Sequence, residues 1–184
     1  MKSKWFLLAL PLSLTACGYN TIQTMDETAA ASKQQIEVQL QRRADLVPNL
    51  VETVKGYAKQ EETIFTEVAK ARAGLAGAVQ GGNIAEMANA NQAMTGALGR
   101  LLAIAEAYPQ LKSDQNFLRL QDELTGTENR IAVSRTDYNN AVRDYNAYIR
   151  RFPQVVTAKV ISAKAREYFE VTSPGNREAP TVKF

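Results

Sequence analysis

Few residue types in this chain could carry covalent or metal chemistry. The 184 residues include one cysteine, Cys17, and no histidine. Without histidine, no Ser-His-Asp or Cys-His arrangement can form, and histidine-based zinc sites are excluded. Carboxylates, lysines and tyrosines remain available as acids, bases or nucleophiles. We therefore predict no catalytic residue, no metal site and no cofactor.

The only thiol follows an apolar N-terminal segment. Residues 1–4 are basic, residues 5–16 are mainly apolar, and Cys17 and Gly18 come next. This order is typical of a secretory signal peptide. A membrane span is disfavoured, because twelve helical residues rise about 18 Å whereas the hydrocarbon core is about 30 Å thick.

The end of this segment, Leu14-Thr15-Ala16-Cys17, resembles the lipobox of bacterial lipoproteins. The resemblance implies lipid transfer to the Cys17 thiol, cleavage after Ala16 and, in many species, acylation of the new amino terminus with a chain such as palmitate. Several acyl chains anchor a protein stably where one does not. The alternative is an ordinary core cysteine behind an ordinary signal peptide. We predict that residues 1–16 are cleaved and that residues 17–184 form a lipid-anchored domain.

The composition of the exported domain limits the classes of partner that we expect it to bind. The formal net charge of +3 falls to +1 once Lys2 and Lys4 are removed. No electrostatic footprint for nucleic acid remains, so we expect no nucleic-acid partner. With Cys17 lipidated, the domain has no free thiol and no disulfide, which suits an oxidising compartment.

Heptad spacing of apolar residues predicts the first helix. Steps of four and three residues connect Ile36, Leu40, Arg43, Val47, Leu50, Val54, Tyr57, Glu61, Ile64, Val68, Ala71 and Leu75. This seam predicts one helix over residues 19–79, ended by Gly81 and Gly82. Pro48 is expected to kink this helix between Ala44 and Pro48. The alternative is two helices that break near Asp45 or Asn49.

Three further helices are expected. Asn83 and Glu86 have capping-box spacing before a helix over 84–107, in which Gly96 and Gly99 would let neighbouring helices approach closely. Ser113 would cap a helix over 114–152, where a seven-residue repeat connects Phe117, Leu124, Ile131, Tyr138, Tyr145 and Phe152. A short helix over 154–169 would turn Val156, Val160, Ala163 and Ala165 inward.

These elements predict an all-α fold. It is an up-and-down bundle of three long antiparallel helices, the first kinked at Pro48, with a short C-terminal helix and an extended tail over 171–184.

Polar residues interrupt both seams. Arg43 and Glu61 lie on the first, and Gln121, Glu128 and Arg135 on the third helix. The favoured interpretation is a structural layer that pairs across helices and fixes their register. The alternative is a ligand or metal site between helices, although bundle di-metal sites use a Glu-x-x-His motif.

Two surface patterns stay open. Asn139, Asn140 and Asn146 stand among three tyrosines, as in a recognition surface or the edge of an amphipathic face. Basic clusters at 42–43, 150–151 and 159–166 are more often solvated helix faces than contacts to anionic headgroups.

Several stretches resemble the LemA family. They are LQRRADLVPNLVETVK at 40–55, ENRIA at 128–132, and then Arg135, Tyr138-Asn139, Tyr145-Asn146, Phe152-Pro153, Glu167-Tyr168-Phe169 and the tail from 179 to 184. The resemblance covers about 19–184. It implies a helical bundle with one N-terminal membrane anchor, no established catalytic activity and no accepted ligand-binding residues.

Many members of that family have a transmembrane helix where this chain has the lipobox. By resemblance to lipoprotein sorting rules, Gly18 is not the Asp that retains a lipoprotein in the inner membrane. We therefore expect an extracytoplasmic lipoprotein of the cell envelope, on the periplasmic face of the outer membrane if the cell has one.

The expected function is a non-enzymatic helical scaffold or interaction module that acts on envelope proteins or the membrane. Its partners and oligomeric state are open. The rival is a carboxylate-dependent enzyme or small-ligand binder that uses Glu61 and Glu128, and a purely architectural role is a third possibility.

Overall fold

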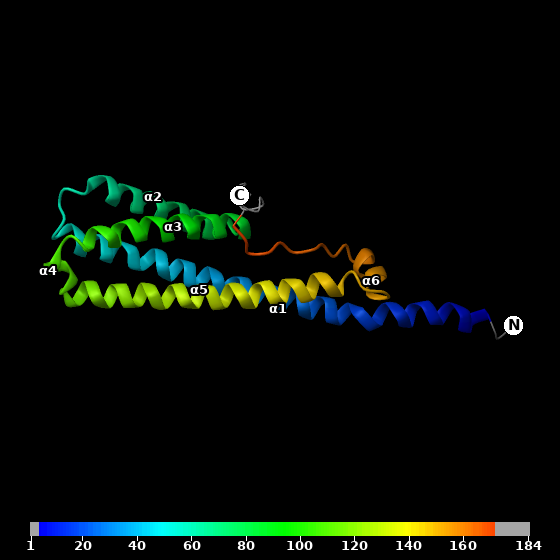
Figure 1. Ribbon diagram of the computed structural model, residues 1–184. Coiled ribbons are helices and arrows are strands. Elements are labelled where there is room, and N and C mark those ends of the chain that lie inside the picture. The colour runs from blue at the N-terminus through cyan, green and yellow to red at the C-terminus, as the bar shows by residue number, and fades with distance from the viewer. Residues whose placement is uncertain (1–3, 172–184) are drawn as a thin grey trace, which may run out of the picture. The chain divides into compact units, whose positions relative to one another are not determined.

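The protein folds almost entirely as helix in a computed structural model (Figure 1). The structure describes residues 4–171, with side chains from Gly18 onward. The helices are α1 (Lys4–Lys55), α2 (Glu62–Gly81), α3 (Ile84–Ala105), α4 (Pro109–Lys112), α5 (Gln115–Tyr148) and α6 (Gln154–Val160). No strand occurs within residues 4–171, and the predicted all-α bundle is confirmed.

The chain forms two compact units. Unit 1 comprises Met1–Ile36 and Ser134–Tyr168, and unit 2 comprises Glu37–Val133 and Phe169–Phe184. In unit 2, α2 lies along α3 (Figure 1). The core of unit 2 includes the seam residues Leu40, Val47, Leu50, Val54, Val68, Leu75, Leu124 and Ile131. The core of unit 1 centres on Ile22, Tyr145, Ile149 and Ala158.

The prediction of one helix over 19–79 is wrong, because the chain turns at residues 56–61 between α1 and α2. Helical bonding ends where the amides of Tyr57 and Ala58 both donate to the Val54 carbonyl. The seam did not reveal this turn, since the turn preserves the heptad spacing and both helices face the same core. The prediction that the helix continues across Pro48 is confirmed, and its bend stays a prediction.

Caps mark three helix boundaries in unit 2. Gly82 ends α2 in the left-handed conformation, with a φ of 67°. The Asn83 side chain accepts from the amides of Ala85 and Glu86 at 2.9 and 3.1 Å, as the capping-box spacing predicted. The cap of α5 is Asp114 rather than the predicted Ser113.

The expected close approach at Gly96 and Gly99 is wrong. A Cβ at Gly99 would meet nothing within 4 Å, and one at Gly96 would meet only the Arg100 side chain, at 3.9 Å. Alanine-rich composition alone does not show which glycines face another helix.

The end of the chain differs most from the prediction. The helix expected over 114–152 ends at Tyr148, so Phe152 is 83% exposed although the earlier members of its repeat are buried. The helix expected over 154–169 ends at Val160, where Ser162 takes a φ of 55° and the Ala163 amide donates to the Ala158 carbonyl at 2.9 Å. This is a Schellman ending with serine in the position that usually holds glycine. Of the predicted tail, residues 172–184 lie outside the described residues.

Candidate functional site

Arg43 joins three helices of unit 2 inside the bundle. Its side chain is only 2% exposed. Nη1 donates to Oδ1 of Asn91 on α3 at 2.7 Å, and Nη2 donates to Oε2 of Glu128 on α5 at 2.9 Å. The Thr95 hydroxyl lies 3.5 Å from the other Glu128 oxygen. We call Arg43, Asn91, Thr95 and Glu128 the Arg43 cluster.

The electrostatics of this cluster suit a structural contact. Burial lowers the pKa of Arg43, and the attraction of Glu128 opposes that shift. An arginine starts so far above neutrality that it stays charged. The Glu128 side chain is 50% exposed, so water solvates one side of the carboxylate while the other side neutralises the buried cation.

Two buried polar atoms of α1 lack a hydrogen-bond partner in the described structure. They are Nε of Arg43 and Oε1 of Gln39, one helical turn earlier. Such an atom costs about 1–3 kcal/mol, which leaves the cluster incompletely satisfied.

A cavity of about 330 Å³ adjoins the Arg43 cluster. Gln121 lines it together with Arg43 and Glu128, and leucines of α3 and α5 form its apolar wall. The cavity has the mixed lining of a small-molecule pocket, but the arginine and the carboxylate in it already bind each other.

A second arginine explains why α1 tolerates Pro48. Pro48 has no amide hydrogen, so the carbonyl of Ala44 loses its helical partner. Arg72 of α2 supplies a replacement, because its Nε donates to that carbonyl at 2.9 Å. Sequence reasoning missed Arg72: the proline shows which carbonyl is free, but not which donor reaches it.

The remaining members of the predicted polar layer lie elsewhere. Glu61 stands in the turn before α2, where its backbone carbonyl accepts from the amides of Ile64 and Phe65 and its side chain makes no cap. Arg135 is exposed and belongs to unit 1. The structure thus brings Arg43 and Glu128 into contact with Gln121 beside them, and does not bring Glu61 to that cluster.

A set of polar contacts in unit 1 was not predicted from the sequence. We call its residues, Asp26, Tyr138, Tyr145, Asn146, Arg166 and Glu167, the clasp. Arg166 donates from Nε to Oδ1 of Asp26 on α1 at 2.7 Å. Asn146 of α5 bonds both backbone groups of Arg166, at 2.8 and 2.9 Å. The Tyr138 hydroxyl donates to the Glu167 carbonyl at 2.7 Å. These contacts hold the segment after α6, an extended trace in Figure 1, against both long helices.

Asp26 and Arg166 stabilise each other's usual charge state. The hydrogen bond from Arg166 holds the pKa of Asp26 below its ordinary value, although burial acts in the opposite direction. Burial raises the pKa of Tyr138 and of Tyr145. Tyr138, Tyr145 and Asn146 are buried, so these members of the asparagine–tyrosine pattern serve packing rather than an exposed recognition surface.

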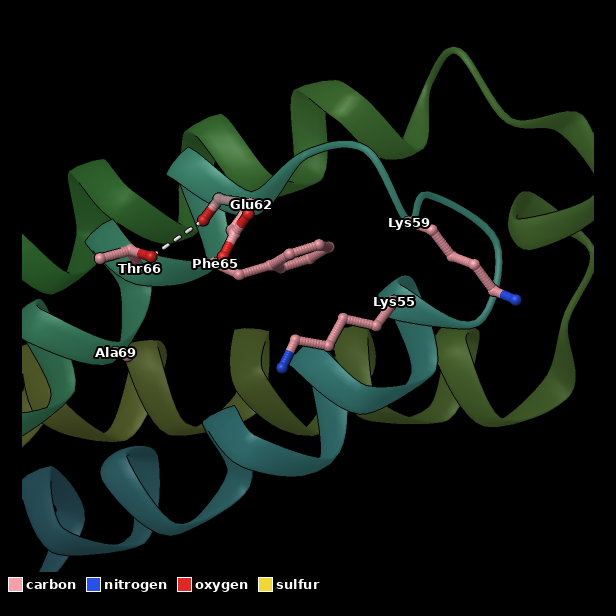
Figure 2. Close-up of a pocket in the computed structure, with 6 residues that line it drawn as sticks. All are labelled: Lys55, Lys59, Glu62, Phe65, Thr66 and Ala69. Atoms are coloured by element: carbon pink, nitrogen blue, oxygen red, sulfur yellow. Dashed lines mark hydrogen bonds between the residues drawn. The ribbon is translucent and has the colours of Figure 1, made fainter.

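Figure 2 shows a cavity of about 470 Å³ at the turn between α1 and α2. Nζ of Lys55 lies 5.6 Å from the centroid of the Phe65 ring, within cation–π range, and 3.3 Å from a Glu52 oxygen. The ammonium groups of Lys55 and Lys59 point in different directions in this view. The cavity therefore presents an aromatic wall without a convergent set of charges.

The described residues form neither a metal-ligand cluster nor a membrane span. No group of three or more His, Cys, Asp or Glu side chains among them could hold a metal ion. None of the helices in this part of the chain combines the length and apolarity that crossing a bilayer requires.

Fold and clusters together define a helical-bundle protein in which arginine side chains, one of them buried, connect separate parts of the chain. The model of the LemA family matches residues 32–184, and the chain belongs to that family. The matched range contains the Arg43 cluster and Arg166, and it begins after Asp26.

The chain is also similar to curated proteins of magnetic bacteria. The magnetosome proteins MamQ 2 and MamQ 1 of Paramagnetospirillum magneticum (strain AMB-1) are each 31% identical to it in an alignment of 181 residues that covers 86% of this chain. Magnetosome protein MamQ of Magnetospirillum gryphiswaldense (strain MSR-1) gives the same values. The chain spans 66% of the length of each of these relatives.

Proposed function

We propose that this protein is a lipid-anchored, non-enzymatic scaffold or interaction module of the cell envelope. The lipobox-like residues Leu14-Thr15-Ala16-Cys17 support the anchor. Membership of the LemA family and the likeness to magnetosome proteins support a place in a membrane-bound assembly. The proposal takes no reaction from those relatives.

The way in which the bundle pairs its charged side chains supports a scaffold. Arg43 binds an amide and a carboxylate, and Arg166 binds a carboxylate, all within the chain. A catalytic acid or base instead needs to face a reacting group with its proton free to move. The pairing of Arg43 with Glu128 is the observation that carries the non-enzymatic part of the proposal.

The proposed anchor is tested by measuring whether Cys17 is lipidated in cells. In cells fed a palmitate analogue, the wild-type chain should be labelled and should float with membranes. Cys17→Ser should abolish the label and leave the signal peptide attached. Ser13→Ala, outside the four lipobox residues, is the matched control and should behave as wild type. An unlabelled wild-type chain would refute the anchor.

A small-ligand binder is the second candidate, because the cavity of about 330 Å³ adjoins Glu128. Glu128→Gln separates the two functions. If the variant keeps the wild-type melting temperature but loses a cellular phenotype of the protein, ligand binding is favoured. If it loses stability in proportion to the phenotype, the scaffold proposal stands.

A further inference from the structure

Two valines of α6 face outward. Val156 and Val160 are 47 and 75% exposed, and their spacing of four residues places them on one face of the helix. Phe152, which lies two residues before the start of α6, is 83% exposed. The buried side chains of this helix are Thr157 and Ala158. The prediction that Val156 and Val160 point inward is therefore wrong.

Close packing within unit 1 explains this inverted helix. Ala158 packs in the cluster of Ile22, Tyr145 and Ile149, where a small side chain lets α6 approach the long helices. The approach is also close at Gly18, where a Cβ would lie 3.2 Å from Cγ of Gln154. The helix therefore lies against the residue that directly follows Cys17.

Exposed basic residues flank the exposed apolar residues in the sequence. No acidic residue occurs between Asp144 and Glu167, and residues 18–25 carry no charge. Arg150, Arg151 and Lys159 are exposed and make no ion pair within the described structure. We call Phe152, Val156 and Val160, with these three basic residues, the α6 patch.

We propose that the α6 patch docks on the surface of an anionic lipid bilayer, beside the anchor at Cys17. Apolar side chains with a basic rim are the chemistry that binds the interface of such a bilayer. This inference rests on the proposed anchoring. A lipidated Cys17 would keep a bilayer next to α6, so even weak docking would be populated at the resulting effective concentration.

Docking would determine the orientation of unit 1 relative to the membrane. A lipid on one residue leaves a domain free to rotate, whereas a second contact made by α6 would restrict unit 1 to one orientation on the membrane. The membrane is favoured over a protein as occupant because the same unit carries the proposed lipid and because the rim has one sign of charge.

A tryptophan reporter tests this directly. The only tryptophan, Trp5, lies in the segment proposed to be cleaved, so Val160→Trp places a single indole in the patch of the mature lipoprotein. Val38→Trp is the matched control, because Val38 is an exposed valine of unit 2, 61% exposed. Each full-length lipoprotein is reconstituted in vesicles of phosphatidylethanolamine and phosphatidylglycerol, with and without brominated acyl chains.

With Val160→Trp, we expect emission shifted to the blue and quenched by the brominated chains, whereas the control should show neither effect. Water-like, unquenched emission from a protein that still floats with vesicles would overturn docking and leave the anchor intact. A blue shift without quenching would indicate a protein contact and would also overturn it. Loss of flotation in both variants would overturn anchor and docking together.

The contribution of the basic residues of the α6 patch to docking is tested separately, in the Val160→Trp background. Arg150→Gln with Arg151→Gln should lower the ratio of docked to undocked protein by about fivefold per residue, about 1 kcal/mol each. Arg119→Gln, an exposed arginine of unit 2, should change nothing. If the double variant matches Arg119→Gln, the assignment to anionic lipid is wrong.

Discussion

At the scale of single residues, two arginines do different work. Arg43 is buried and connects three helices of unit 2, whereas Arg166 is partly exposed and fastens an irregular segment in unit 1. Both depend on a carboxylate partner from another part of the chain. A change in that carboxylate should therefore reveal what each contact contributes.

Glu128→Gln should lower the free energy of unfolding by about 1–2 kcal/mol. The buried Arg43 would lose its counter-charge, and a hydrogen bond to a charged group contributes about 1.5–3 kcal/mol. The expected loss lies around and below the lower end of that range because the Glu128 side chain is half exposed to solvent.

Urea denaturation measures this change, and Glu61→Gln is the control. Glu61 stands outside the cluster, so the same substitution there should stay within about 0.5 kcal/mol of wild type. Equal losses for both variants would show that Arg43 does not depend on Glu128.

Acid should loosen the clasp of unit 1. The hydrogen bond from Arg166 holds the pKa of Asp26 below the ordinary value of 3.8 for an aspartate. For a depressed carboxylate, the stabilisation is complete above the unfolded pKa and is lost as the pH falls through the folded pKa. Protection of the Arg166 amide against hydrogen exchange should therefore fall below about pH 4.

Asp26→Asn removes the titrating group from this contact. The variant should show weaker protection of the Arg166 amide at neutral pH and a smaller change on acidification. Glu27→Gln, at the neighbouring position, should keep the wild-type profile. If Asp26→Asn also keeps it, another group controls the clasp.

At the scale of elements, α1 and α2 form an antiparallel hairpin. One side chain of α2, that of Arg72, forms a hydrogen bond to the backbone of α1. Arg72 lies about as many residues after the turn at 56–61 as Ala44 lies before it, and its side chain therefore reaches the Ala44 carbonyl. The contact compensates for Pro48 and ties the two helices together. The same carbonyl would have a helical partner if residue 48 had an amide hydrogen.

A double-mutant cycle checks this reasoning. Arg72→Ala should cost about 1–2 kcal/mol in the wild type, and clearly less in a Pro48→Ala background, where residue 48 can donate to Ala44 itself. Arg100→Ala is the control, because its ion pair with Glu67 is exposed at both ends and should contribute about 0–1 kcal/mol in either background. Equal costs of Arg72→Ala in both backgrounds would contradict the compensation.

At the scale of the whole molecule, the proposed anchor would give the residue after it a second role. If the protein follows the sorting rules of bacterial lipoproteins, Gly18 would permit its transfer to the outer membrane. In the structure it also lets Gln154 approach α1, since a Cβ would lie 3.2 Å from Cγ of Gln154. A substitution at this position must separate sorting from packing.

Gly18→Asp should shift the protein from the outer-membrane to the inner-membrane fraction in a cell with two membranes. Gly18→Ser adds a Cβ at the same place without a charge, so it controls for packing and should keep the wild-type distribution. Fractionation followed by immunoblotting measures both. If the two variants distribute alike, the residue acts through packing and not through sorting.

The sequence by itself determined the helical fold, the buried seams and several boundaries of the described chain. Heptad spacing predicts which side of a helix is apolar, and Asn83 three residues before Glu86 predicts a helix cap. Both predictions succeed because each depends only on residues that are close in the sequence. The same spacing placed Arg43 and Glu128 on seams.

Only the tertiary structure decided how these elements meet. A turn that keeps the heptad phase looks like continuous helix in sequence, so the hairpin at 56–61 stayed hidden. Contacts between distant residues, such as Arg72 with Ala44 or Arg166 with Asp26, depend on interhelix register, which no local pattern encodes. The outward face of α6 has the same origin, since the pocket left by α1 and α5 admits Ala158 and leaves Val156 and Val160 in solvent.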